Sequence, residues 1–212
     1  LKSKKEKIVK EGKAGKLYLK GSKYTYALPD WYAVCEHLFM DADNPKGLLD
    51  KEEVYCNLYP SGEMNILRSP SLSFEHVTHN NIIDEKKSDW YITKGIYISS
   101  HSTLPLIVQC DFDGDQLLTT NHKSIVSASK RTRERLDVVP LKYDMGVATP
   151  QEVSKENIYD SLIDAFGVNI GLYSNTISKV WNKLDFNEKD YELIKVICAA
   201  NNWAIDFAKT KY

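Results

Sequence analysis

The stretch "IVQCDFDGDQLL", residues 107–118, places three aspartates at alternate positions around one glycine, directly after an apolar run. Three carboxylates about 5 Å apart repel one another by roughly 3 kcal/mol per pair at an effective dielectric of about 20. Either some of them keep their protons or a cation sits among them. A solvated surface turn is the simplest alternative, because Asp and Gly are turn formers. The apolar residues on both sides argue against it, since they indicate a turn anchored by buried strands.

Length and composition set broad limits on the protein. The 212 residues are 42% hydrophobic and 27% charged with a net charge of -1, which suits one large domain or two small ones. No apolar stretch approaches the roughly 20 residues that span a bilayer, so no membrane partner is expected. The cysteines form no CxxC pair, which suggests neither a zinc knuckle nor a disulfide framework and fits a cytoplasmic protein: Cys35, Cys56, Cys110 and Cys198.

The periodicity divides the chain into two halves. Residues 16–128 hold short runs rich in Tyr, Ile, Val and Leu, separated by turn formers, at 16–28, 52–59, 62–68, 89–99 and 104–110. No helix-length amphipathic pattern alternates with these runs, which disfavours a doubly wound sheet and favours a compact barrel or sandwich. We therefore expect an α+β fold, with its β-rich part first.

After Pro140 the apolar residues recur at helical spacing. Thr149, Pro150 and Glu152 predict the start of one helix, whose apolar stripe is Ile158, Leu162, Ile163 and Phe166. Asn187 predicts the start of a second helix, with a stripe from Ile194 to Ile205. The expected organisation is a lysine-rich leader at 1–15, a barrel at 16–128, a linker at 129–150 and a helical segment at 151–212.

Three chemistries could use the aspartates. A calcium loop of the EF-hand type is excluded, because Gly114 stands at position 4 instead of 6 and His122 stands at position 12. A haloacid-dehalogenase-like phosphatase would use Asp111 as nucleophile and Asp113 as acid-base, but Asp115 replaces that family's Thr and no βα alternation follows. A magnesium site for nucleotidyl transfer fits best. Side chains at i, i+2 and i+4 share one side of an extended backbone, and hard oxygen ligands favour Mg²⁺.

Two motifs carry a resemblance to a known family. "QCDFDGDQL" resembles the NADFDGDQM signature of the largest subunit of multisubunit RNA polymerases. "ILRSPSLSFEH" is similar to that subunit's NRAPTLHR segment, matching at Arg68, Pro70 and Leu72, with Ser73 and Phe74 in place of His and Arg.

The surrounding segments resemble another branch more closely. "YLKGSKYTYALPDWYAV", "KEEVYCNLY" and "LRSPSLSFEHVTHNNII" precede the aspartates, and "IGLYSNTISKVW" and "ANNWAIDFAKTKY" follow them. This order is similar to that in single-chain, two-barrel RNA polymerases: the eukaryotic-type RNA-dependent RNA polymerases of RNA silencing and their bacterial and phage relatives. The resemblance covers residues 16–212.

The resemblance implies a fold, a reaction and a set of site residues. The fold would be a double-psi β-barrel followed by a mainly helical segment. The reaction would add ribonucleoside triphosphates to an RNA 3′ end on a DNA or RNA template. Asp111, Asp113 and Asp115 would hold the catalytic Mg²⁺, or Mn²⁺ in its place. Arg68 and Gln109 would contact the incoming nucleotide, Gln109 standing where the multisubunit enzymes have Asn.

The resemblance also implies a missing partner. The relatives build their active site between two barrels, so the first barrel of the same polymerase is an expected partner, and the 212-residue chain by itself is expected to be inactive. A barrel kept only for nucleic-acid binding is the remaining alternative. Binding alone would not need three carboxylates that repel one another.

Overall fold

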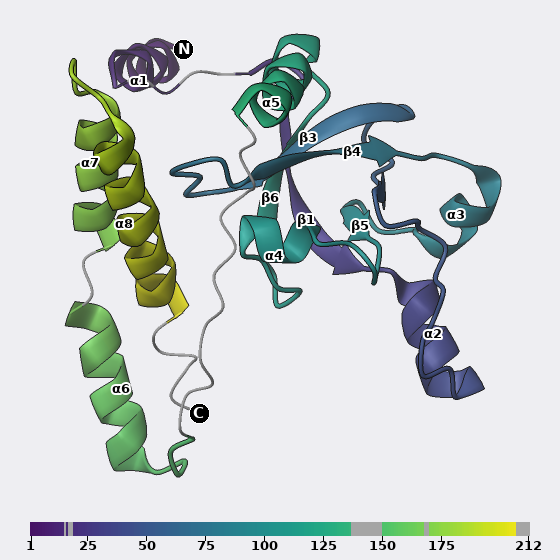
Figure 1. Ribbon diagram of the computed structural model, residues 1–212. Coiled ribbons are helices and arrows are strands. Elements are labelled where there is room, and N and C mark those ends of the chain that lie inside the picture. Colours follow the sequence, from purple (N-terminus) through teal and green to yellow (C-terminus); the bar gives the residue numbers. More distant parts are fainter. Residues whose placement is uncertain (15, 17–18, 137–149, 168–169, 207–212) are drawn as a thin grey trace.

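Six strands close into a mixed barrel in the computed structural model, which describes residues 1–14, 16, 19–136, 150–167 and 170–206 (Figure 1). The strands follow one another around the barrel in the order β1-β5-β2-β4-β3-β6. The β1–β5 and β2–β4 pairs are parallel, and the other four are antiparallel. The bounds are β1 Lys23–Pro29, β2 Glu53–Tyr55, β3 Gly62–Arg68, β4 His76–Asn81, β5 Ile96–Ile98 and β6 Gln116–Thr120. The expectation of an α+β fold built on a barrel is confirmed.

The barrel interior is an apolar core to which every strand contributes. Its members are almost fully buried and include β-branched residues that suit a pleated surface: Ala27, Val54, Met64, Ile66, Val77, Ile96, Ile98 and Leu117. Val108 and Leu104 close the same core from the helix that precedes the aspartates. The core therefore holds both ends of the aspartate loop.

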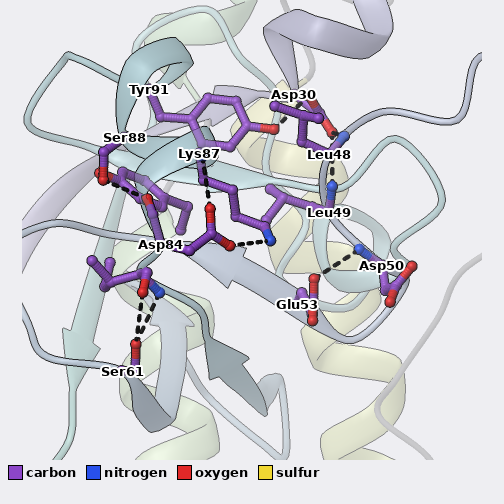
Figure 2. A network of polar contacts seen from close by, with 12 residues as sticks. Asp30, Leu48, Leu49, Asp50, Glu53, Ser61, Asp84, Lys87, Ser88 and Tyr91 are labelled. Carbon is purple, nitrogen blue, oxygen red and sulfur yellow. Dashed lines mark hydrogen bonds and ion pairs between the residues drawn. The ribbon is translucent and has the colours of Figure 1, made fainter.

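A buried carboxylate organises the opposite end of the barrel. Asp30 ends β1 and caps helix α2, Trp31–Met40, where its side chain accepts from the N–H of Tyr32. The same carboxylate accepts from the N–H of Leu48 at 2.7 Å and from the Tyr91 hydroxyl at 2.6 Å (Figure 2). Including Ala33 and Leu49, five donors satisfy it, so Asp30 is a structural residue.

Three segments of the β-rich half differ from expectation. Residues 31–40 form α2 because Asp30 supplies an N-cap. Residues 104–110, predicted as a strand, begin with helix α4, Leu104–Val108, and Pro105 in its first turn favours that helix. The end of 89–99 alone is strand β5, because helix α3, Glu85–Trp90, occupies its start.

The helices flanking the barrel revise the predicted boundaries. Helix α1 spans Lys2–Lys13, and helix α5 spans Lys123–Leu136, so the predicted linker at 129–150 begins inside a helix. The basic run belongs to an amphipathic helix whose other side packs on the barrel, where Asn65 Nδ2 donates to Ser129 Oγ at 3.0 Å. Residues 137–149 lie outside the described residues.

The helical segment contains α6, Lys155–Gly167, α7, Ile170–Trp181, and α8, Glu188–Asp206. Helix α6 begins later than predicted because Ser154 Oγ accepts from the N–H of Asn157; Thr149 lies outside the described residues. Asn187 does cap α8, accepting from the N–H of Lys189 at 3.0 Å. Helices α7 and α8 pack side by side (Figure 1). The stripe of α8 is buried at Ile194, Cys198, Asn201 and Ala204.

The predicted stripe of α6 is exposed in the described structure, from 43% at Ile158 to 94% at Phe166. No helix among the described residues is long and apolar enough to cross a membrane.

Candidate metal and nucleotide site

The aspartates lie on a tight loop between α4 and β6. Gln109 ends α4 in the left-handed conformation, with φ 54°, and the N–H of Cys110 returns to the Pro105 carbonyl at 3.0 Å. At the other end the Asp115 carbonyl accepts from the N–H of Ala27 in β1 at 2.9 Å. Backbone hydrogen bonds therefore fix the loop where it enters and where it leaves.

The three carboxylates converge. One oxygen from each of Asp111, Asp113 and Asp115 lies within 4.8 Å of the others. The N–H of Asp113 donates to Asp111 Oδ1 at 3.2 Å, and the N–H of Asp111 donates to Asp115 Oδ2 at 3.1 Å. Gly114 allows the turn because its φ of +123° is one that other residues rarely adopt.

Arg68 reaches the loop from the end of β3. Its Nη2 lies 2.9 Å from Asp115 Oδ1, and its Nη1 donates to the Gln109 carbonyl. The side chains of Arg68 and Asp115 are only 18% and 17% exposed, so the pair is shielded from water. Asp111 and Asp113 are exposed. The structure thus joins a half-buried, ion-paired carboxylate to two that face solvent.

Gln109 takes part through its backbone. Its side-chain Nε2 donates to the Leu106 carbonyl in its own helix at 2.8 Å, while its carbonyl meets Arg68. The structure therefore brings Arg68 and Gln109 together beside the aspartates. The predicted contact of the Gln109 side chain with a substrate stays a prediction.

Cys110 lies within the loop but is not suited to ligation. Burial, and then the charge of Asp115, raises the pKa of its thiol to about 12, although Arg68 acts in the opposite direction. The thiol is therefore protonated at neutral pH, whereas the thiolate is the form that binds metals. The donors of the site are oxygen atoms only, which is the set that Mg²⁺ and Mn²⁺ prefer.

The rest of the described chain offers no second cluster of this kind. Asp111, Asp113 and Asp115 are the one group of three or more acidic, His or Cys residues found there with the spacing of metal ligands. His76 and His79 are spent on protein contacts: a ring nitrogen of His79 lies 3.0 Å from Ser102 Oγ, and one of His76 lies 3.2 Å from Asn65 Nδ2. The side chain of Asp206 and residues 207–212 lie outside the described residues.

Comparisons with known proteins agree with this site. No family model matches the chain. Over all 212 residues the chain is 44% identical to the DNA-directed RNA polymerase YonO of Bacillus phage SPbeta, of which it spans 25%. Its fold resembles that of the RNA-dependent RNA polymerase QDE-1 from Thielavia terrestris, with a TM-score of 0.52 over 89% of this chain and 22% of that one.

The two matches carry different information. Identity to QDE-1 is 12%, so that likeness concerns the fold alone. The match to the phage protein is one of sequence, and the chain spans about a quarter of that relative's length. The closed six-stranded barrel fits a double-psi β-barrel, with the DFDGD loop on its rim. Sequence and fold together show that this chain belongs to the two-barrel RNA polymerase family.

Proposed function

We propose that this chain is the catalytic barrel of an RNA polymerase that adds ribonucleoside triphosphates to an RNA 3′ end on a nucleic-acid template. The observation that carries the proposal is the convergence of three carboxylates beside a shielded arginine, in a chain 44% identical to a polymerase. Barrel packing alone does not call for three acidic side chains on one loop, because each pair costs repulsion.

Asp111, Asp113 and Asp115 would hold Mg²⁺, with Mn²⁺ as an alternative. The donor set fits, since three carboxylate oxygens within 4.8 Å of one another leave room for further oxygen ligands from the substrate. When bound, the metal supplies activation of the RNA 3′ hydroxyl and stabilisation of the leaving pyrophosphate. The protein contributes a loop whose carboxylates are already oriented by backbone N–H groups.

Arg68 would bind the incoming ribonucleoside triphosphate. Its contacts with Asp115 and the Gln109 carbonyl use two of the five N–H donors of a guanidinium. The remaining donors suit the oxygen atoms of a ribose or a phosphate. The ion pair holds the group at the edge of the carboxylate cluster, where such a ligand would lie.

The partners follow from the family. The sequence relative is described as DNA-directed, so we propose DNA as the template and RNA as the product. The other barrel of the polymerase would supply the cations that neutralise the triphosphate. The aspartate loop holds no lysine or arginine from Gln109 to Gln116, and Arg68 is already paired.

Two alternatives lose support. A phosphatase of the haloacid-dehalogenase type would need strands and helices to alternate after the loop, but in the described residues no strand follows Thr120. A barrel that only binds nucleic acid would gain nothing from a carboxylate cluster that repels phosphate.

The test is RNA synthesis by the complete polymerase containing this chain, with labelled nucleotides and Mg²⁺. We expect extension on single-stranded DNA, and its loss in Asp113→Asn. Asp43→Asn, an exposed carboxylate on another loop, is the matched control and should extend normally. Near wild-type synthesis by Asp113→Asn would overturn the assignment of the site. Extension on RNA instead of DNA would overturn only the choice of template.

A further inference from the structure

The segment that follows Arg68 is held by the helical hairpin. Trp181 Nε1 in α7 donates to the Leu72 carbonyl at 2.9 Å. The Phe74 ring packs edge-on against Trp181, with centroids 5.9 Å apart. Leu72 itself lies against the buried cluster of α7 and α8 that includes Ile177 and Ile194. The hairpin is therefore attached to the barrel directly behind Arg68.

Helix α8 also reaches the back of the aspartate loop. A small cavity of about 10 Å³ is lined by Arg68 and Gln109 on one side and by Glu75, Asn202 and Ile205 on the other. Arg68 and Gln109 are the pair joined by the Nη1 hydrogen bond. A polar cavity of this size suits a single water molecule.

The wall of this cavity on the side of α8 carries polar atoms that the described structure leaves unpaired. Glu75 is 5% exposed, and its Oε2 accepts from the N–H of Leu72 at 3.0 Å, while its Oε1 makes no hydrogen bond there. Asn202 Nδ2 is buried and unpaired as well. Burying such atoms without partners costs about 1–3 kcal/mol each, so their placement calls for an explanation.

We propose that Glu75 and Asn202 are positioning residues, which hold Arg68 and the Gln109 carbonyl in the geometry that binds the nucleotide, through polar contacts across this cavity. The contact ties the loop after Arg68 to α8 on one side and to the aspartate loop on the other. It makes nucleotide affinity depend on a helix that begins about 120 residues after Arg68. This inference rests on the proposed function of Arg68.

The experiment compares two substitutions of the same kind at neighbouring positions of α8 in the complete polymerase. Asn202→Leu removes the amide that lines the cavity. Asn201→Leu removes a fully buried amide that is also unpaired but does not line it. Steady-state kinetics of nucleotide addition and thermal unfolding are measured for both.

Asn202→Leu should raise the apparent KM for nucleotides about five- to tenfold, with kcat within about twofold of wild type. Its Tm should not fall, because Leu is nearly isosteric and removes an unpaired polar group. Asn201→Leu should leave KM unchanged. Glu75→Gln, which keeps the shape and the contact with Leu72, should raise KM in the same direction.

Two results would overturn the inference. One is an unchanged KM in Asn202→Leu and Glu75→Gln. The other is an equal rise of KM in Asn201→Leu, which would mean that any change in the packing of α8 has this effect. Absence of synthesis by the wild-type polymerase would instead overturn the proposed function, so the two failures are distinguishable.

Discussion

Asp113 and Asp115 should respond in opposite ways to the same substitution. Both carboxylates belong to the cluster, but Asp113 is exposed, whereas Asp115 is shielded and paired with Arg68. Replacing either by Asn removes one charge and nearly keeps the shape. We expect both variants to lose RNA synthesis in the complete polymerase, while their effects on stability differ.

The magnitudes follow from the geometry. Carboxylate oxygens within 4.8 Å repel by about 3.5 kcal/mol at an effective dielectric of about 20, and by about 1 kcal/mol at that of water. Asp113 faces solvent, so Asp113→Asn should change the free energy of unfolding by between zero and a gain of about 1 kcal/mol. Asp115→Asn loses a charge-assisted hydrogen bond to Arg68 and should cost about 2 kcal/mol. For a chain of this size that is a fall in Tm of about 4–8 °C.

Thermal and urea unfolding of the 212-residue chain measure these changes. A double-mutant cycle with Arg68→Gln separates the ion pair from other effects of Asp115→Asn, and its coupling energy should be near the full loss. Equal destabilisation by Asp113→Asn and Asp115→Asn would refute the reasoning, because it would mean that the pairing with Arg68 does not distinguish the two carboxylates.

Four further outcomes are expected. In the complete polymerase, Arg68→Ala should raise the apparent KM for nucleotides about 10- to 150-fold, the loss of one charge-assisted contact, and unchanged nucleotide kinetics would contradict this. Asp30→Asn should lower the free energy of unfolding by about 3 kcal/mol, measured by urea titration against the exposed Asp50→Asn control, because an amide cannot accept from all five donors. Burial lowers the pKa of His76 and His79 from the usual 6.5, so the unfolded chain binds protons first, and stability should fall as the pH drops from 7 toward 5; His79→Gln should flatten the slope of Tm against pH, and an unchanged slope would exclude His79 as a source. The 212-residue chain alone should yield no extended RNA with Mg²⁺, template and labelled nucleotides, whereas extension would show that no second barrel is needed.

Local patterns were sufficient for the elements whose neighbours matter little. The run "GEMNILR" predicts a strand over 62–68, and β3 has those bounds, because Pro60, Ser61 and Gly62 mark its start. The start of α8 follows from Asn187 in the same way. By contrast, the apolar run at 104–110 is short enough to suit a strand or a helix, and periodicity alone does not separate them. Pro105 was the signal that favours the helix.

The order of the strands lies beyond local patterns, and the barrel prediction came from the family resemblance. β1 pairs with β5 and β6, which are about 70 and 90 residues away, and nothing within β1 specifies those partners. Closure also decides burial, so Asp30 and Tyr91, 61 positions apart, meet in one network. A sequence pattern reports such a carboxylate only as the cap of the helix that follows it.

The candidate site divides along the same line. The aspartates are neighbours in sequence, so their spacing was enough to predict that they converge, whereas the ion pair of Arg68 with Asp115 spans 47 positions. Gln109 shows the sharper limit. The sequence points to its side chain, but the group that meets Arg68 is its carbonyl, which every residue possesses. What brings that carbonyl to Arg68 is the left-handed conformation at the end of α4, in which the chain turns from the helix into the aspartate loop. The backbone at 109 therefore decides this contact, and the identity of the side chain matters only through the conformations it allows.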